Sequence, residues 1–220
     1  MPRQPFHHGN LRAELLERAE AVLRESGAET LSLRELARDA GVSHGAPRSH
    51  FRDRGALLDA LAERGFDRLA EAIEAAAQAL PAEPGAGPDL LRAAGGAYLD
   101  FASDNPALLA LMVAAKADDP SGPVHDAAAR LFAAMTALVT TVVGPRIHDA
   151  ANIERLTLLL SATVQGIASL VASRRIPAAQ GDILLDDAIR VFVAGTLGAT
   201  PFLAWPQSAL DRDQRKRPPR

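Results

Sequence analysis

Apolar residues recur at steps of three and four along most of the chain, which is the spacing of an α-helix with one buried face. The longest uninterrupted run follows Asp53, a candidate N-cap, and continues to Leu80. It predicts a helix about 40 Å long. No stretch has the strict alternation that is typical of β-strands, so the pattern predicts an all-α protein with about nine helices.

A compact pair of helices is predicted between Leu31 and Phe51, in the sequence LSLRELARDAGVSHGAPRSHF. Ser32 and Glu35 have the spacing of a capping box, in which each side chain bonds to the backbone amide of the other residue. Gly41 is expected to end the first helix, because glycine enters the left-handed conformation at little cost. Two short helices joined at a steep angle by a glycine-containing turn form a helix-turn-helix, which many DNA-binding proteins use.

The second helix of this pair is expected to begin between Ser43 and Gly45 and to end at Phe51. Pro47 is unusual inside it, because proline lacks an amide hydrogen and crowds the carbonyl group four residues earlier. A helix that begins near Gly45 would tolerate it, since Pro47 would then lie in the first turn. Capped helical hairpins are common, so these residues alone leave DNA binding and a purely structural hairpin as equal alternatives.

The flanking residues favour DNA binding. The segment from His7 to about Leu69 resembles, without a gap, the N-terminal domain of the tetracycline-repressor (TetR) family of bacterial transcription regulators. The shared features are the glycine after the first helix, the run Thr30-x-Ser32-x-Arg34-Glu35-x-Ala37, the turn Ala40-Gly41-Val42-Ser43 and the ending His50-Phe51. Family members usually carry Tyr where this chain has Arg48 and Lys where it has Arg54. Arginine can contact phosphate and can also read guanine, so the resemblance leaves the operator specificity open.

The resemblance implies a DNA-binding transcription regulator, with a repressor as the favoured form. Such a protein binds a palindromic operator as a homodimer and is released by a small hydrophobic effector. The residues expected to reach base edges are Ser43, His44, Ala46 and Arg48, and those expected to contact phosphates are Thr30, Arg34, Ser49, His50, Arg52 and Arg54. We assign residues 1–54 to this domain, whose family counterpart extends to about residue 69.

Residues 55–205 are predicted to form a helical ligand-binding and dimerisation domain. The clearest linker within it is residues 81–88 (PAEPGAGP), and Asn105 followed by Pro106 predicts the restart of a helix. A mostly apolar pocket beneath the long helix would suit a hydrophobic ligand. Six residues are candidates to line it, although each of them singly also fits ordinary core packing: Phe101, Leu108, Met112, Phe132, Met135 and Gln165.

The last two helices, predicted at about 149–174 and 182–199, carry apolar residues on most sides. Such helices must be covered on most sides, which favours a homodimer over the alternative of central helices in a monomer. The family resemblance points the same way, because TetR proteins typically dimerise through a four-helix bundle made by their last two helices. Gly166, Gly195 and Gly198 would let the backbones approach closely.

The C-terminal half also resembles one TetR subgroup, whose ligand domain carries a Trp-x-x-x-His-Gly motif. The counterpart here, residues 161–166 (SATVQG), matches the motif only at Gly166. The run Asn105-Pro106-Ala107 followed by Leu111-Met112 fits the subgroup better. The family resemblance is therefore more specific than the subgroup resemblance.

Composition and charge constrain the function less. The net charge of −3 does not by itself indicate a nucleic-acid partner, but residues 1–54 are the least acidic part of the predicted fold, so a cationic surface must come from arrangement. The chain has no cysteine, which excludes disulfides and thiolate metal sites and fits a reducing cytoplasm. No signal peptide is evident, and the most apolar later stretches, near 156–171 and 191–204, look short or interrupted for a membrane span.

Two other classes of function fit less well. A helical enzyme would need a catalytic or metal-binding cluster, and neither a phosphate-binding glycine loop nor a nucleophile elbow occurs. Four possible metal ligands lack suitable spacing: Asp118, Asp119, His125 and His148. Pro47 and Arg48 keep open a third class, a dimeric scaffold with a non-functional DNA-binding domain. We expect no metal and no cofactor, and we expect residues 206–220 to form a disordered tail.

Overall fold

The computed structural model describes residues 11–81, 86–115, 122–143, 147 and 149–197. Within these ranges the chain forms eight α-helices, two short 3-10 helices and no strand, which confirms the all-α prediction. One of the 3-10 helices stands where a ninth helix was expected. The tail at 206–220, Gly198, and three of the four candidate metal ligands lie outside the described residues.

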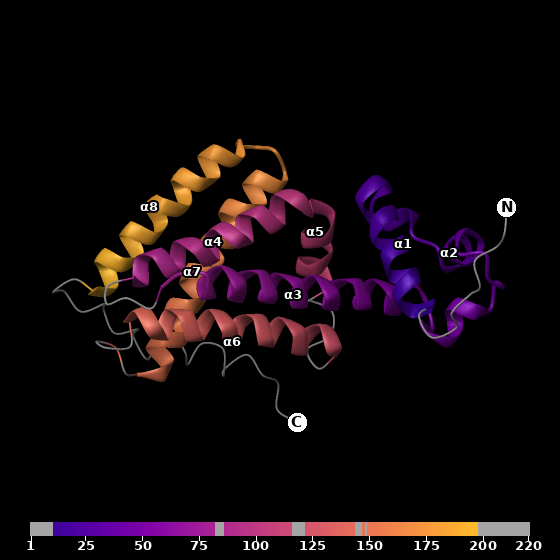
Figure 1. Ribbon diagram of the computed structural model, residues 1–220, viewed down its shortest axis with the longest axis horizontal. Helices are drawn as coiled ribbons and strands as arrows, with labels where there is room; N and C mark the ends of the chain where they lie inside the picture. Colours follow the sequence, from indigo (N-terminus) through magenta and orange to yellow (C-terminus); the bar gives the residue numbers. More distant parts are fainter. Residues whose placement is uncertain (1–10, 82–85, 116–121, 144–146, 148, 198–220) are drawn as a thin grey trace, which may run out of the picture.

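Four short elements form one end of the molecule (Figure 1), and we call residues 11–53 the head. These elements are α1 (Leu11–Ser26), η1 (Ala28–Thr30), α2 (Leu33–Asp39) and η2 (Ala46–Ser49). Leu15, Leu36 and Phe51 are almost wholly buried where the elements meet. The head therefore has its own small apolar core, which fixes the angle between its helices.

Glycines end the first two helices of the head, as the sequence predicts. Gly27 and Gly41 have φ angles of 81° and 67°, in the left-handed region. After α2, the amide of Val42 donates to the carbonyl of Ala37 over 3.0 Å, and the amide of Gly41 donates to the carbonyl of Arg38 over 3.1 Å. This pair of bonds is a Schellman motif, which satisfies carbonyls at the end of the helix.

The start of α2 differs from the prediction. The Ser32 side chain makes no capping hydrogen bond, so the predicted capping box with Glu35 was wrong. The seven-residue helix buries Leu36 and Ala37 instead, and tertiary packing rather than a side-chain cap stabilises so short a helix.

Helix α3 (Arg54–Gln78) is shared between the head and the rest of the molecule. Its predicted cap is confirmed, because the Asp53 carboxylate accepts a hydrogen bond of 2.8 Å from the amide of Ala56. From there α3 continues through the middle of the molecule and packs against α4, α5 and α6 (Figure 1). A single helix of 25 residues, about 38 Å long, thus connects the two parts.

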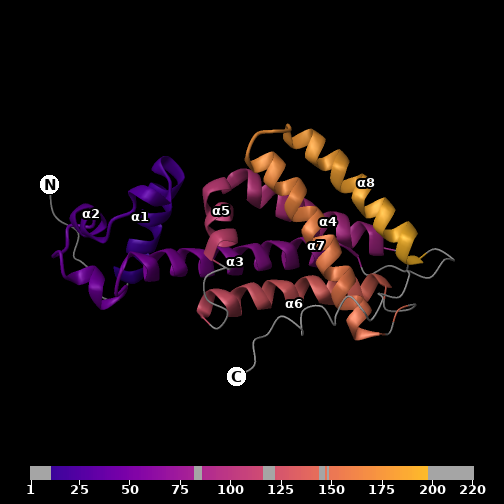
Figure 2. The ribbon, with the colours of Figure 1, turned by 180° about the vertical axis from the view of Figure 1, so that it is seen from behind.

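Five further helices surround the far part of α3, and we call them the body. They are α4 (Gly87–Asp104), α5 (Pro106–Ala115), α6 (Pro123–Val143), α7 (Ala150–Ala172) and α8 (Ala178–Leu197). Seen from behind, α6 runs beside α3, while α7 and α8 lie together across α4 (Figure 2). Pro106 begins α5 as the sequence predicts, since proline suits the first position of a helix.

Helices α6 and α7 are each long and apolar enough to cross a membrane, judged by length and composition alone. The expectation that the stretch near 156–171 is too short was wrong, because α7 extends over 23 residues. Each helix nevertheless buries one face in the body, with Val139 and Val143 on α6 and Leu156 and Ala168 on α7. Core helices of a helical bundle have this character.

Candidate nucleic-acid interface

The head carries a surface hollow where α2, η2 and the start of α3 meet. Five of the ten residues predicted to contact DNA line it: Arg34, His44, Arg48, Arg52 and Arg54. One carboxylate, that of Asp53, also lines the hollow. Four guanidinium groups around a concave surface with a single acid make a site suited to an anionic backbone.

Two of these arginines have no internal partner. The side chains of Arg34 and Arg48 are exposed, and no carboxylate among the described residues pairs with either of them. Arg52 lies next to Asp53, with 3.3 Å between its Nε and the carboxylate Oδ2, but both side chains are well exposed. The positive charge of the hollow therefore remains available to a partner outside the chain.

Arg54 also makes internal hydrogen bonds that the sequence did not predict. Its Nε donates to the Leu31 carbonyl over 3.1 Å, and its Nη2 donates to the Ala28 carbonyl over 2.7 Å. The half-buried guanidinium thus ties the start of α3 to the connection between α1 and α2. The assignment of Arg54 as a phosphate contact stays a prediction, and its remaining N–H groups can still donate to a phosphate while these two bonds are kept.

The predicted recognition helix is reduced to the four-residue 3-10 helix η2. The amide of Ala46 bonds to the Ser43 carbonyl over 3.0 Å, and the amide of Arg48 bonds to the Gly45 carbonyl over 3.1 Å. Pro47 has no amide to continue the α-helical pattern toward Ser43, and its buried ring fills the centre of this turn. The expected α-helix up to Phe51 was therefore wrong: of the candidate base-reading residues, Ala46 and Arg48 lie on this 3-10 helix, whereas Ser43 and His44 precede it.

The other predicted DNA contacts lie around this turn. Ser43, Ser49 and His50 are exposed, whereas Ala46 is half-buried. The Ser49 hydroxyl donates to the Ala46 carbonyl over 2.7 Å, and the Thr30 hydroxyl donates to the Gly27 carbonyl over 3.0 Å. Each of these hydroxyl oxygens can still accept a hydrogen bond, but neither can donate to a phosphate without losing its internal bond.

Sequence reasoning missed Arg12 on α1. Its guanidinium carbon lies 5.5 Å from the centroid of the Phe51 ring, which places a further, exposed arginine beside the end of η2. The signal for it was weak, because Arg12 follows the first apolar residue of α1 and has the spacing of an ordinary solvent-facing position.

The body holds a cavity of about 110 Å³ among α3, α4, α5, α6 and α7. Four of the six predicted ligand-lining residues line it: Met112, Phe132, Met135 and Gln165. Tyr98 and Phe66, which were not predicted, line it as well. A cavity therefore lies beside the long helix, where the sequence predicted a pocket.

Phe101 and Leu108 do not line this cavity, so it gives no support to their assignment, which stays a prediction. The Phe101 ring packs under the Arg68 guanidinium at 5.8 Å, and Leu108 faces Gly65 of α3 and a crevice next to α1. Leu109, one residue further along α5, lines the cavity instead. On a helix that is apolar all round, the sequence does not reveal which face borders the cavity.

Head and body meet at a cluster around Glu20 of α1. Its carboxylate accepts a hydrogen bond of 2.5 Å from Nη1 of Arg68, and Nε of Arg64 lies 4.0 Å away. The Glu20 side chain is only 12% exposed. Arg68 also donates to the amide oxygen of Asn105 over 3.4 Å, at the corner between α4 and α5. One arginine on α3 thus bonds to both parts of the molecule.

A helix-turn-helix head with a cationic hollow, joined by one long helix to an all-helical body with an apolar cavity, belongs to the class of helical DNA-binding regulators. Sequence families support this class. Residues 15–61 match the family described as bacterial regulatory proteins, tetR family, and residues 91–192 match the tetracyclin repressor-like C-terminal domain. The chain belongs to the tetR family, and both matching family descriptions are those of regulatory proteins rather than enzymes.

Solved structures share the fold of this chain. A protein of unknown function from Rhodococcus sp. RHA1 is 40% identical, with a TM-score of 0.77, and the match covers 88% of this chain and 99% of that one. A regulatory protein in the tetR family from Rhodococcus RHA1 shares 20% identity and has a TM-score of 0.59, covering 84% of this chain and 96% of its own. A TetR-family transcriptional regulator from Streptomyces coelicolor shares 17% identity at a TM-score of 0.64, with 86% and 96% covered. Among curated protein sequences, none matches this chain.

Within the described residues, no group of three His, Asp or Glu side chains is placed to hold a metal ion. His125, the one described member of the four possible ligands, is exposed near the start of α6.

Proposed function

We propose that this regulator is a homodimeric repressor, which binds a palindromic operator in the cytoplasm and is released by a small, mostly apolar effector. The observation that carries the proposal is the pair of exposed, unpaired arginines, Arg34 and Arg48, on the hollow of the head. An unpaired guanidinium gains charge-assisted bonds from a phosphate or a guanine edge without losing any internal bond.

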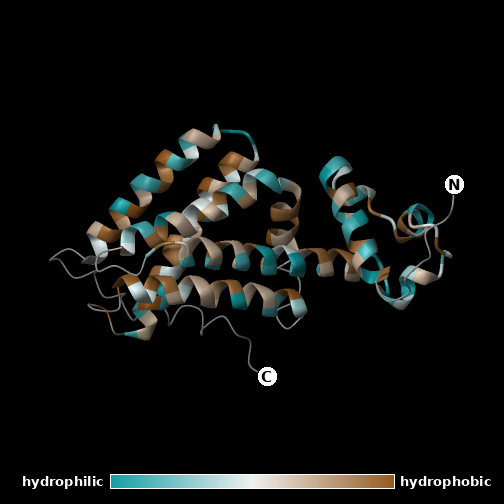
Figure 3. Cartoon of the chain, viewed as in Figure 1, coloured by the Kyte–Doolittle hydropathy of each residue, from teal (hydrophilic) through white to brown (hydrophobic). Residues whose placement is uncertain are grey.

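The outer faces of α7 and α8 support the dimer. Four large apolar side chains are exposed there: Leu158 (54%), Leu159 (48%), Ile183 (61%) and Val191 (74%). Figure 3 shows apolar bands alternating with polar ones along α8. Gly166, on the same outer side of α7, has open space around the position of a Cβ atom, so a second helix could approach it closely. A twofold axis through these helices would give two heads and a palindromic site, with half-sites about 34 Å apart.

The body cavity supports an effector that acts on the heads. Phe66 of α3 lines it, and so does Met112 of α5, whose side chain packs against Gly65 of α3. A molecule that fills the cavity would press on the helix that begins at the head. If it favours a dimer whose heads no longer fit two half-sites, then operator DNA must weaken effector binding by the same factor.

The first test is binding of the purified protein to the DNA flanking its own gene, at two salt concentrations with excess competitor DNA, followed by footprinting. A protected near-palindrome that survives the competitor would support the operator. Binding that competitor displaces and salt abolishes would place the operator elsewhere. A well-folded dimer that retains no DNA at low salt would favour the alternative of a scaffold with a non-functional head, for which the short η2 gives a reason.

The dimer is tested with Val191→Asp on α8 and the matched control Ala133→Asp on α6. Both positions are exposed in the single chain, so neither change should unfold it. We expect Val191→Asp to weaken dimerisation at least tenfold in sedimentation velocity, because it would bury a charge at the interface. Ala133→Asp should leave the dimer unchanged. Equal behaviour of the two variants would place the interface on another surface.

A further inference from the structure

The body contains two cavities that share a wall. The larger, of about 110 Å³, and a smaller one of about 30 Å³ are both lined by Tyr98 of α4 and Met135 of α6. The smaller cavity continues along α3 to Ile73 and along α7 to Thr157. These two side chains therefore border both cavities.

Tyr98 is a polar residue in this wall, and its hydroxyl has no hydrogen-bond partner among the described residues. The side chain is 93% buried. Burial raises the pKa of Tyr98 to about 12, so the phenol stays neutral and keeps its proton at physiological pH. The hydroxyl oxygen is not among the fully enclosed atoms without a partner, so it keeps accessible surface and can donate to a molecule in the cavity.

The other hydroxyls in the two linings are already satisfied. The Thr157 hydroxyl donates to the Ile153 carbonyl over 2.9 Å, and the Ser161 hydroxyl donates to the Thr157 carbonyl over 2.6 Å. No acidic or basic side chain lines either cavity. A charged ligand would lose its hydration there without gaining a counter-ion, which excludes acids and amines on energetic grounds.

Met135 can open the wall. Methionine is unbranched and adapts its shape at low cost, and this side chain is only half-buried. At the mouth of the larger cavity, Val113 and Gln165 are exposed, which gives a molecule from solvent a way in.

We propose that the two cavities form one site for a neutral, mostly apolar molecule that carries a hydrogen-bond acceptor such as a ketone or ester carbonyl. The Tyr98 hydroxyl donates to this acceptor, and the apolar part of the molecule displaces Met135 and occupies both cavities. The inference rests on the proposed function and deepens it, because it names the chemical class of the effector.

The test uses three aromatic probes of similar length on the free protein without DNA: butyrophenone, butylbenzene and phenylbutyrate. Affinity is measured by calorimetry at neutral pH. We expect the ketone to bind about tenfold more tightly than the hydrocarbon, which is the free energy of about one net hydrogen bond, and the anion to bind more weakly than both. Tyr98→Phe should remove the preference for the ketone and leave hydrocarbon binding unchanged.

Thr157→Val is the matched control, because it also removes a hydroxyl from the lining, but one that is internally bonded. It should keep the tenfold preference. Equal affinity for ketone and hydrocarbon in the wild type, tightest binding of the anion, or no binding of any probe would each overturn the inference. DNA retention is measured separately, so failure of the ligand class and failure of operator binding are distinguishable.

A second variant tests whether the cavities join. Met135→Ile replaces a flexible side chain with a stiff, branched one. We expect it to weaken binding of octanophenone, which must fill both cavities, at least fivefold, and to change acetophenone binding little. An equal effect on the long and the short ketone would show that the cavities stay separate.

Discussion

Arginines of the body and arginines of the head are used in different ways. In the body, Arg92 donates to Asp186 over 2.5 Å and to Asp89 over 2.7 Å, and Arg130 on α6 donates to Asp67 on α3 over 2.7 Å. Hydrogen bonding to Asp186 and the nearby carboxylates raise the pKa of Arg92. In the head, Arg34 and Arg48 face solvent without a carboxylate partner among the described residues.

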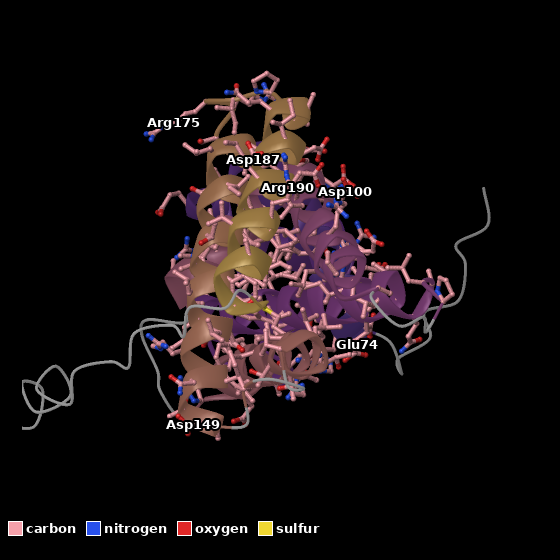
Figure 4. All side chains as sticks on the ribbon, turned by 90° about the vertical axis from the view of Figure 1, so that its left-hand side faces the viewer. Glu74, Asp100, Asp149, Arg175, Asp187 and Arg190 are labelled. Atoms are coloured by element: carbon pink, nitrogen blue, oxygen red, sulfur yellow. The ribbon has the colours of Figure 1, made fainter. Side chains whose placement is uncertain are left out.

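The comparison shows why net charge is a poor guide to this protein. Several arginines of the body are paired with carboxylates, as Arg190 is with Asp187 on the outside of α8 (Figure 4). Fewer ion pairs surround the hollow of the head, so the positive charge of its arginines remains available to a partner outside the chain. The unpaired guanidinium groups, and not the net charge of the chain, therefore attract an anionic partner.

The sharpest test of this difference is the double variant Arg34→Ala with Arg48→Ala. We expect operator affinity to fall at least 100-fold, because each lost contact costs about 1–3 kcal/mol of binding free energy. The free energy of unfolding should stay within about 0.5 kcal/mol of the wild type, since both side chains are exposed. Gel retardation and thermal denaturation measure the two quantities.

The matched control for that variant is Arg130→Ala in the body. It removes a cation of the same size, but one that is paired with Asp67 across α3 and α6. Operator affinity should change less than threefold. A comparable loss in both proteins would mean that bulk charge, and not the hollow, attracts DNA.

The comparison between head and body also separates what the sequence could and could not predict. Local signals worked where one residue type decides the backbone: Gly27, Gly41 and the Asp53 cap are all as expected. They failed where two local rules compete, because Pro47 in a four-residue turn overrides the helical pattern around it. Hydrogen-bond partners that are distant in the sequence, such as the carbonyls that accept from Arg54, cannot be predicted from the spacing of residues.

The cavity was predictable only in outline. The apolar helices predicted around the long helix implied a pocket beneath α3, and four of the six predicted lining residues line the cavity. The rotation of each helix about its axis decides the rest, and on α5 nearly every position is apolar, so Leu108 and Leu109 could not be told apart. Tyr98 had a usable signal, since it is the only tyrosine in the chain.

That single tyrosine offers the next test, which concerns the body alone. An unfolded tyrosine titrates near pH 10, whereas burial raises the pKa of Tyr98 to about 12. The folded state therefore binds the proton more tightly, and its stabilising effect is complete below about pH 10 and is lost as pH rises toward 12. We expect the free energy of unfolding to fall by about 2–3 kcal/mol over this range.

Phenolate absorbance reports on Tyr98 directly, because no other tyrosine is present. Tyr98→Phe should remove most of the alkaline loss of stability while keeping the same fold. A phenolate that forms near pH 10 in the folded protein would contradict the buried position of the side chain.

A smaller loss of stability is expected from a change at Glu20, where the head meets the body. Glu20→Gln keeps the shape of the side chain but removes the charge that Arg68 and Arg64 approach. Because Glu20 is mostly buried while Arg68 is about one-third exposed, we expect a loss of about 1–2 kcal/mol in the free energy of unfolding. Asp67→Asn, which weakens the exposed pair with Arg130, should cost less stability than Glu20→Gln, because solvent screens an exposed pair. Urea denaturation of both variants compares the two pairs, and equal losses would mean that the joint is no stronger than a surface ion pair.

The finest test compares two helical glycines of the body side. A Cβ atom on Gly65 of α3 would lie 2.6 Å from Sδ of Met112 and 3.2 Å from Cγ of Leu108, whereas a Cβ on Gly96 of α4 meets nothing within 4 Å. Alanine at Gly96 should therefore stabilise the protein by about 0.5–1 kcal/mol, through helix propensity alone. At Gly65 the same gain is offset by displacement of buried Met112, and we expect a net loss of about 1 kcal/mol.

Because Met112 also lines the larger cavity, Gly65→Ala should weaken probe binding as well, while Gly96→Ala should not. Thermal denaturation measures the stability of the two variants. Equal stabilisation by both changes would mean that Met112 moves freely. The contents of the cavity would then not act on α3 through this contact.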